Sequence, residues 1–309
     1  MQVAVGIDIG GTKTAIGLVD ADGLVLSKAV LPTDQALSPA HMVEQMAATV
    51  RRLLHEANIQ EAQLQGIGIG APGPLNTKLG QIAEPPNMRG WWGFPVVDAF
   101  KSHFSRVPIA FENDATAAAL AEKWVGAAKD ADHFVYVTIS TGIGAGIYSH
   151  GRLLTGATGN AGDVGHMVID MSAGVCPCGQ RGCFEYVASG TAIAREASKL
   201  LGRPVTTKEA FELAGSGEQD EQDELAKLVR QVLDYIGAGC TTLINTFDPE
   251  LLVIGGGVSQ IGDTLFEAVT QYVQRYALNP SGRQTPIVPA RLKQDAGLIG
   301  AAALVHIAY

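Results

Sequence analysis

The sequence predicts an α/β protein assembled from two similar halves. Segments with the alternating apolar pattern of strands take turns with segments that have the 3.6-residue spacing of amphipathic helices, which is typical of sheets covered by helices. Segment 135–142 also repeats the pattern of 5–12, a strand followed by a turn of small residues. A chance likeness between two glycine hairpins is the alternative explanation. With 309 residues, the chain is long enough for two domains and a sizeable core.

The first half is expected to open with a β-meander. Strand, glycine turn, strand, turn and strand patterns follow one another over 3–26. Ser38 and Pro39 then supply the N-cap and the first-turn proline of a helix whose apolar residues share one face. Further strands are expected over 65–70 and around 109–111, with a loop rich in Pro, Gly and Trp between them.

The second half is expected to repeat this order with different residues. Its acidic stretch 215–224 should begin a long helix whose apolar stripe includes Cys240, so this cysteine is expected to be a buried core thiol. The other expected elements are an alanine-rich helix ending near Gly126, strands over 134–152, a strand over 251–254 and a final helix of small residues over 295–307.

The composition argues against several functions. Twenty-two Lys and Arg against 31 Asp and Glu give a net charge of −9, which repels nucleic acid phosphates and anionic lipids. We therefore expect neither a nucleic acid nor a membrane partner. No run of about 18 apolar residues occurs, and the N-terminal residues lack the pattern of a signal peptide. The sequence predicts a cytoplasmic protein.

Three of the four cysteines are crowded into one short segment that follows a histidine. Disulfides are rare in a reducing compartment, and three thiolates with one imidazole make a closed tetrahedral zinc site. Because four protein ligands leave no open position, this zinc is expected to be structural. Free thiols or a redox pair are the alternatives. The ligands are His166, Cys176, Cys178 and Cys183.

Three junctions between a strand and a glycine turn are candidate phosphate or nucleotide contacts. They lie at 8–14, 140–144 and 255–257, and none matches a Walker A loop or a dinucleotide-binding fingerprint. Ordinary hairpin turns are the alternative. Asp8 is a stronger indication, because a carboxylate on a core-facing strand needs a cation or hydrogen-bond donors. Magnesium held through water fits this position.

A third group of polar residues, Glu112-Asn113-Asp114, stands where a strand ends and a helix begins. A chemical role and a purely structural one both fit this place, because Asn and Asp are preferred helix N-caps.

Together these motifs resemble the ROK family of bacterial sugar kinases, repressors and uncharacterised proteins over essentially the whole chain. The resemblance implies the duplicated actin-like ATPase fold, which is ribonuclease H-like, with two α/β domains around a cleft. It implies a small domain at 1–114 that the C-terminal helix 297–309 rejoins, and a larger domain at 115–296 that carries the zinc loop. The motifs are Asp8-Ile9-Gly10-Gly11-Thr12-Lys13, Glu112-Asn113-Asp114-Ala115, Ser140-Thr141-Gly142-Ile143-Gly144, Gly162-Asp163-Val164-Gly165-His166, the segment 176–185 and Ile254-Gly255-Gly256-Gly257.

The resemblance also implies roles for individual residues in an ATP-dependent transfer to a sugar hydroxyl. Asp114 would be the general base and would also contact the sugar. One ring nitrogen of His166 would bind zinc and the other would face the sugar, while Asp8 would lie near Mg²⁺. The other sugar contacts implied are Gly73, Asn113, Asp163 and Glu185. The contacts implied for ATP are Gly10, Gly11, Thr12, Lys13, Thr141 and Gly142 at the phosphates, and Gly256 and Gly257 at the nucleoside.

One departure from the family bears on the substrate. The family usually has Glu three residues before the zinc histidine, whereas this chain has the shorter Asp163. A sugar 2-hydroxyl would then be held less tightly, or a bulkier 2-substituent admitted. The cysteine pattern is more similar to glucokinases and N-acetylhexosamine kinases than to the fructokinase-like branch. We expect phosphorylation of the glucose 6-hydroxyl. The alternatives are N-acetylmannosamine, N-acetylglucosamine, mannose or fructose, and either Trp91 or Trp92 could stack on the sugar.

Two other classes of function are weighed against the kinase. A repressor of the family would bind sugar without phosphorylating it, but repressors carry a winged-helix segment before the first strand, which here starts at Val3. A silent sugar sensor would not need both Asp8 and Asp114. The resemblance implies a homodimer or homotetramer and a place in carbohydrate metabolism such as glycolysis. The sequence leaves open whether polyphosphate replaces ATP, and what regulates the protein.

Overall fold

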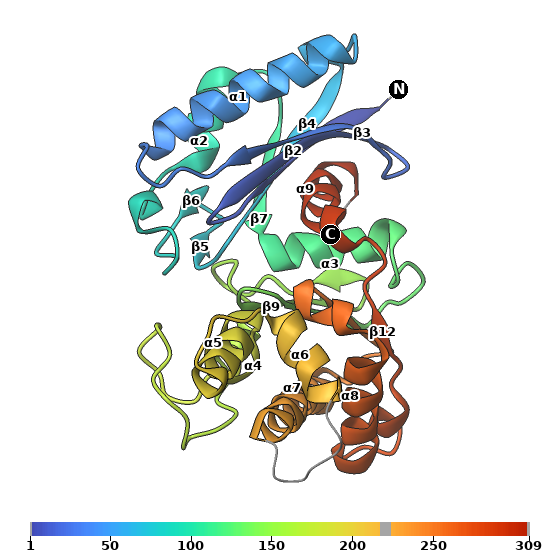
Figure 1. Ribbon diagram of the computed structural model, residues 1–309. Helices are drawn as coiled ribbons and strands as arrows, with labels where there is room; N and C mark the ends of the chain where they lie inside the picture. The colour runs from blue at the N-terminus through green and yellow to red at the C-terminus, as the bar shows by residue number, and fades with distance from the viewer. Residues whose placement is uncertain (1, 217–223, 308–309) are drawn as a thin grey trace. The chain divides into compact units, whose positions relative to one another are not determined.

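The first sheet of the computed structural model, which describes residues 2–216 and 224–307, has the strand order β3-β2-β1-β4-β7 (Figure 1). Strands β1 (Val3–Ile9), β2 (Lys13–Asp20) and β3 (Val25–Pro32) form the antiparallel meander that the sequence predicts. Strands β4 (Leu64–Ala71) and β7 (Ile109–Asn113) extend the sheet in parallel with β1.

Helices cover both faces of this sheet. Helices α1 (Pro39–Glu56) and α2 (Val96–His103) lie on one face, and α3 (Asp114–Val125) and α9 (Ala296–His306) lie on the other (Figure 1). Ser38 caps α1 as predicted, because its Oγ accepts from the amide of His41 at 3.3 Å. The small residues of α9 allow a close approach to β1 and β4. A Cβ on Gly68, for example, would collide with the carbonyl of Ala301.

The second sheet has the order β10-β9-β8-β11-β12. Strands β8 (Phe134–Ile139), β9 (Ile143–Ser149) and β10 (Arg152–Leu153) follow one another, and β11 (Leu251–Gly255) and β12 (Ile287–Pro289) continue the sheet in parallel. The order of strands therefore repeats that of the first sheet, which favours duplication over a chance likeness of two hairpins.

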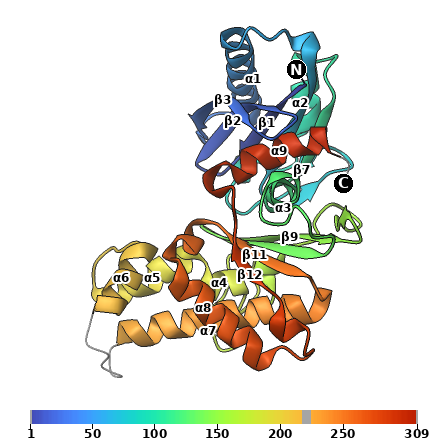
Figure 2. The same cartoon turned by 90° about the vertical axis from the view of Figure 1, so that its right-hand side faces the viewer.

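The helices between β10 and the C-terminal helix α9 lie on one side of the second sheet (Figure 2). They are α4 (Phe184–Ala188), α5 (Gly190–Leu201), α6 (Thr207–Ser216), α7 (Glu224–Phe247) and α8 (Asp263–Tyr276). Most of the acidic stretch 215–224 lies outside the described residues, as do 308–309 of the predicted C-terminal segment. Cys240 on α7 is fully buried, as predicted, and burial raises its pKa to about 12.

The sequence did not predict several short elements. A two-stranded sheet pairs β5 (Leu75–Asn76) with β6 (Gln81–Ile82), and single turns of 3₁₀ helix occupy loops of both halves. These turns lie at 61–63, 89–91, 164–166, 257–261, 282–284 and 293–295.

The contacts within the chain divide it into two units. The first comprises Met1–Asp130, Gly146–Gly162 and Arg291–Tyr309, and the second comprises Ala131–Ala145 and Asp163–Ala290. In the first unit the fully buried carboxylate of Glu122 accepts from three amides, those of Ala127, Arg291 and Leu292, at 2.7–3.2 Å. These bonds attach the returning chain to α3 just before α9 begins.

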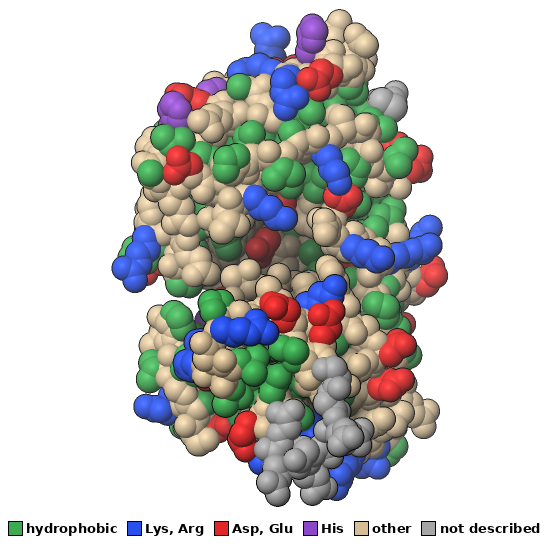
Figure 3. Space-filling model, in the orientation of Figure 1, with side chains coloured by type: hydrophobic (Ala, Val, Ile, Leu, Met, Phe, Trp, Pro, Cys, Tyr) green, Lys and Arg blue, Asp and Glu red, His purple; other side chains and the backbone are tan. Residues whose placement is uncertain are grey.

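The surface charge and the helices of the described residues can be compared with the sequence. On the face shown in Figure 3, acidic and basic side chains of the described residues are interspersed, and no continuous basic patch forms there. Within 2–216 and 224–307, no helix has both the length and the apolar character that a membrane span requires.

Candidate active site

In the first unit, predicted site residues meet at the carboxyl edge of the first sheet. Asp8 near the end of β1 lies opposite Gly70 of β4, and Gly70 lies opposite Glu112 of β7. A Cβ on Gly70 would lie 3.9 Å from Asp8 Oδ1 and 3.6 Å from the Cα of Asp114, so the two acids flank this glycine. Burial and then the charge of Asp114 raise the pKa of Asp8 to about 7, against the opposing effect of Lys13. A divalent cation would relieve this crowding of negative charge.

The N-terminus of α3 presents Asn113 and Asp114. Asn113 is the N-cap, because its Oδ1 accepts from the amides of Ala115 at 3.0 Å and Thr116 at 3.2 Å. The structural role considered for this motif therefore belongs to Asn113. Its side-chain amide nitrogen donates to no acceptor in the described part of the chain, and so can still serve a ligand. Asp114 is half-buried, and its Oδ1 also accepts from the amide of Ala115, at 2.7 Å.

Glu112 was part of a predicted motif but had no predicted role. It is only 3% exposed, and its Oε1 accepts from the amide of Asn113 at 2.9 Å. Burial raises the pKa of Glu112 to about 7, although the bond from Asn113 opposes the rise. This edge of the sheet therefore gathers three carboxyl groups, of which the sequence singled out two.

The first glycine turn, Gly10–Lys13, joins β1 to β2. The amide of Gly10 donates to the carbonyl of Lys13 at 2.9 Å and closes the turn. The amides of Gly11 and Thr12 have no acceptor within the described residues, and Thr12 and Lys13 are exposed. Two such amides beside a lysine are suited to an anion. Gln35 fixes the turn from outside, because its Nε2 donates to the carbonyl of Gly11 at 2.8 Å.

Gly73 and the two tryptophans occupy the loops near this edge. Gly73 lies two residues beyond the end of β4, in a half-buried position. Trp91 is 1% exposed and packs edge-on against Phe94, so it belongs to the core. Trp92 is 48% exposed, and its indole nitrogen donates to the carbonyl of Pro85 at 2.9 Å. Of the two, Trp92 has the accessible ring face that stacking on a sugar requires.

In the second unit, the two remaining glycine turns lie side by side. Thr141 and Gly142 follow β8, Gly256 and Gly257 follow β11, and these strands are parallel neighbours. A Cβ on Gly256 would overlap the backbone of Ile139, and one on Gly257 would lie 3.9 Å from Ser140 Oγ. The structure therefore brings together the residues predicted for phosphate and for nucleoside within this unit.

A cavity of about 1090 Å³ opens beside Gly257 and lies entirely within the second unit. Helices α6, α7 and α8 contribute apolar and polar groups to its wall. Its volume is at the upper end of the range of small-molecule sites, so a nucleoside would fit inside it. The residues that line it include Phe211, Val229, Leu233, Gly257 and Thr264.

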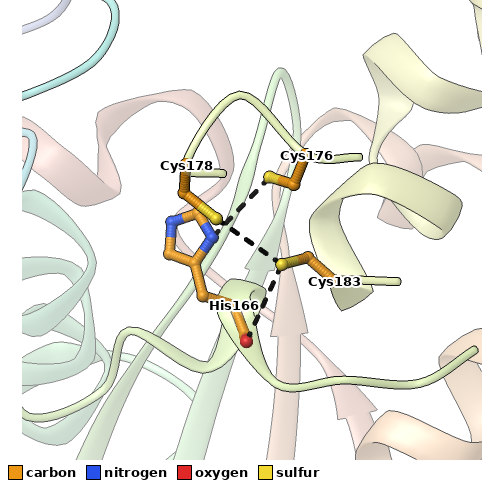
Figure 4. Close-up of side chains that lie close together, drawn as sticks. All are labelled: His166, Cys176, Cys178 and Cys183. Atoms are coloured by element: carbon orange, nitrogen blue, oxygen red, sulfur yellow. Dashed lines mark hydrogen bonds between the residues drawn. The ribbon is translucent and has the colours of Figure 1, made fainter. Parts of the chain in front are cut away.

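His166, Cys176, Cys178 and Cys183 converge as the sequence predicts (Figure 4). Their ligand atoms all lie within 4.8 Å of one another. Tetrahedral zinc with ordinary bond lengths requires ligand atoms about 3.6–3.8 Å apart. Cys178 Sγ lies 3.6 Å from Cys183 Sγ, and Cys176 Sγ lies 3.9 Å from His166 Nδ1. The four residues therefore fit a structural zinc ion.

The loop that carries these ligands is held by its own backbone. The amide of Gly179 donates to the carbonyl of Cys176 at 2.8 Å and makes the tight turn between the first thiols. The side chain of Gln180 donates to the carbonyl of His166 and, at 3.3 Å, to Cys183 Sγ. Burial raises the pKa of Cys176 to about 12, so a bound cation is what would keep this thiol ionised.

Asp163 and Glu185 lie near His166. Burial raises the pKa of Asp163, the neighbouring His166 opposes this rise, and the charge of Glu185 adds to it. Glu185 Oε2 accepts from the amide of Ile143 at 2.8 Å, so one carboxylate oxygen is already used by the turn after β8. The structure thus groups all three residues that were predicted to contact the sugar from this unit.

The ROK family model matches residues 4–308, nearly the whole chain. The protein belongs to the ROK family. Its relatives include a glucokinase from Thermotoga maritima, 34% identical over 97% of this chain and 96% of the relative. An N-acetylmannosamine kinase from Shigella boydii is 35% identical over 99% of this chain and 99% of the relative.

A solved structure confirms the predicted fold class of this ROK protein. The glucokinase from Streptomyces griseus in complex with glucose and AMPPNP superimposes with a TM-score of 0.80 at 30% identity, over 98% of each chain. The duplicated actin-like ATPase fold agrees with the repeated strand order of the two sheets. The contacts assigned to individual residues from the resemblance stay predictions.

Sequence analysis did not identify several residues that shape the site. Gln35 contacts Gly11, and the residues that line the cavity contact one another, across long sequence separations, for which a single sequence carries no signal. Gln180 lies inside the cysteine motif and could have been noticed there. Glu112 lies on β7, an edge strand of the first sheet, so the strand pattern alone gave no reason to expect its burial.

Proposed function

We propose that this ROK protein is an ATP-dependent hexose kinase that phosphorylates the 6-hydroxyl of glucose. The observation that carries the proposal is the pair of carboxylates, Asp8 and Asp114, on either side of Gly70. Two acids at one edge serve a metal-assisted phosphoryl transfer, in which one side chain faces the cation and the other faces the nucleophile. The relatives that are named as sugar kinases support the same reaction.

In this reaction the Asp114 carboxylate takes the proton of the sugar 6-hydroxyl as its oxygen attacks the γ-phosphorus. The bond from that phosphorus to the bridging oxygen breaks, and sugar 6-phosphate and ADP are formed. Such a base needs hydrogen-bond reach and only modest basicity, because positioning and charge neutralisation supply most of the rate. Asn113, Asp163, His166 and Glu185 hold sugar hydroxyls, with the backbone of Gly73.

ATP is held by amides and by the cavity of the second unit. The amides of the two phosphate turns and the charge of Lys13 face the phosphates. The nucleoside passes Gly256 and Gly257 into the cavity, where Phe211, Val229 and Leu233 offer apolar surface. Asp8 would hold Mg²⁺ through water, and the cation would neutralise phosphate charge. The four Cys and His ligands would hold zinc, which would fix the loop of Asp163 and leave Nε2 of His166 for the sugar.

A 2-acetamido hexose such as N-acetylmannosamine is the second candidate substrate. Asp163 favours it, because a carboxylate one methylene shorter than the family's Glu leaves more room beside the sugar's second carbon. Mannose, fructose and N-acetylglucosamine belong in the same comparison.

The substrate is tested by ADP release with Mg-ATP across these five sugars, with kcat/KM measured for each. We expect the highest kcat/KM for glucose. In that case Asp163→Glu should keep or raise kcat/KM for glucose. A preference for a 2-acetamido sugar that Asp163→Glu abolishes would assign the substrate to the second candidate. No turnover with any sugar would contradict the kinase.

The general base is tested by Asp114→Asn. This variant should lose about 10²–10⁴-fold in kcat, because the amide cannot accept the proton. Its sugar affinity, measured by calorimetry, should stay near that of the wild type. Unchanged turnover would refute the assignment of Asp114.

A further inference from the structure

The carboxylate of Glu185 is bonded to the turn that follows β8. Its Oε2 accepts from the amide of Ile143 at 2.8 Å. The same carboxylate leaves no room for a side chain at Gly142, where a Cβ would collide with Oε2 and lie 3.1 Å from Cδ. Glu185 therefore fixes the position of this turn directly, and glycine at 142 is what permits the contact.

The other side of the turn is held by the start of α5. The amide of Gly190 donates to the carbonyl of Ser140 at 2.8 Å, and Thr207 Oγ1 donates to the carbonyl of Gly190 at 2.8 Å. Thr141 and Gly142 lie between these two attachments, and their amides donate to no acceptor within the described residues. The turn is thus clamped at both ends while the amides in its middle stay available.

The position of Glu185 itself depends on the cysteine loop. Cys183 immediately precedes α4, and Glu185 lies in the first turn of that helix. The amide of Phe184 donates to the carbonyl of Met167, next to His166, at 2.8 Å. Phe184 is adjacent to Cys183 and Met167 is adjacent to His166, so this bond joins the start of α4 to the cysteine loop. The loop therefore determines where the Glu185 carboxylate lies.

We propose that Glu185 is a positioning residue for the phosphate-binding turn 140–143 in addition to its contact with the sugar. One carboxylate oxygen holds the turn, and the other faces the sugar. This inference rests on the proposed function, in which that turn binds ATP. It predicts that sugar and nucleotide affinities are coupled through one side chain, and such coupling is reciprocal.

The test is the affinity for Mg-AMPPNP without sugar, measured by calorimetry on the zinc-loaded full-length protein. Glu185→Asp keeps the charge but is too short to reach Ile143, and its affinity should fall by up to about 10-fold, the value of one hydrogen bond. Glu185→Gln keeps the length and an accepting oxygen, so its affinity should stay near that of the wild type. Glu267→Gln, which changes one exposed carboxylate of α8, should leave the affinity for Mg-AMPPNP unchanged.

If Glu185 contacted only the sugar, its variants would bind Mg-AMPPNP with a different order of affinities. If Glu185→Asp binds Mg-AMPPNP as tightly as the wild type, the positioning role is wrong while the kinase stands. If the wild type itself neither binds Mg-AMPPNP nor consumes ATP with any sugar, both proposals fail. Zinc content and thermal melting of each variant establish that it is folded. Glu185→Ala is a second variant that removes the bond, and it should weaken binding to a similar extent.

Discussion

The two halves of the molecule place a glycine turn at the same point of the same strand order, but they equip it differently. In the first half Asp8 lies opposite Gly70, two residues before the turn, and in the second Thr138 lies opposite Gly255 at the corresponding place. Both turns keep two amides without acceptors among the described residues. The repeated backbone geometry therefore serves the same purpose in both halves, which we infer to be contact with phosphate.

The two halves differ in the carboxylates that their strands carry. Asp8, Glu112 and Asp114 lie together at the edge of the first sheet, whereas Thr138 occupies the position of the second sheet that corresponds to Asp8. The second turn receives its carboxylate from outside, through Glu185. The first half thus holds the carboxylates to which the proposed mechanism assigns cation binding and proton transfer, and the second holds a turn that is bonded to the helix after the cysteine loop.

The largest expected effect comes from removing the charge that distinguishes the two turns. Asp8→Asn should raise the Mg²⁺ concentration needed for half-maximal rate by about 10–100-fold, because a carboxylate that orients metal-bound water is lost. Thr138→Val, the matched change in the second half, should leave the Mg²⁺ requirement within about 2-fold of wild type. Steady-state rates across a Mg²⁺ titration measure both. Equal effects at the two positions would remove the distinction between the halves.

A smaller effect is expected from adding a methyl group to each turn. Gly142→Ala should lower the free energy of unfolding by about 1–3 kcal/mol, because the new Cβ would displace the Glu185 carboxylate from its bond with the amide of Ile143. At Gly11 the nearest atom to a new Cβ, the carbonyl oxygen of Asn87, lies 3.7 Å away. Gly11→Ala should therefore change stability by less than about 0.5 kcal/mol. Urea denaturation compares the two, and an equal loss at both positions would contradict the clamp on the second turn.

The smallest effect is a pH dependence confined to the first half. The pKa of Glu112 is 4.5 when unfolded and about 7 when folded, so the native state binds the proton more tightly. Its stabilising contribution is complete below pH 4.5 and is lost as the pH rises to about 7. Glu112→Gln stays neutral and keeps an acceptor for Asn113. It should match wild type at pH 4.5 and exceed it by about 1–2 kcal/mol at pH 8.

The control for this pH dependence is Glu267→Gln on α8, where the side chain is exposed. Its stability difference from wild type should not change between pH 4.5 and 8. A Glu112→Gln variant that is less stable than wild type at pH 8 would show that the ionised carboxylate stabilises the fold.

The sequence predicted those parts of the molecule whose causes are local. The meander, the cap of α1 by Ser38 and the cluster of His166 with three cysteines all follow from neighbouring residues, and the structure has them. The short strand β12 has no periodic pattern of its own and forms because β11 offers it a parallel partner. The bond from Ile143 to Glu185 spans 42 positions, so no spacing rule could reveal it. The double use of Glu185 therefore required coordinates.

The packing of α9 on β1 and β4 has a consequence for synthesis on the ribosome. These two strands are made early, yet the helix that covers this face of them is not made until residue 306. At translation rates of about 5–20 residues per second, the nascent chain spends roughly 12–47 s with that face uncovered by its own helix. The second unit, whose residues end at Ala290, is complete before α9 emerges. The first unit to be started is thus the last to be finished, and until then the uncovered face of its strands is prone to aggregation.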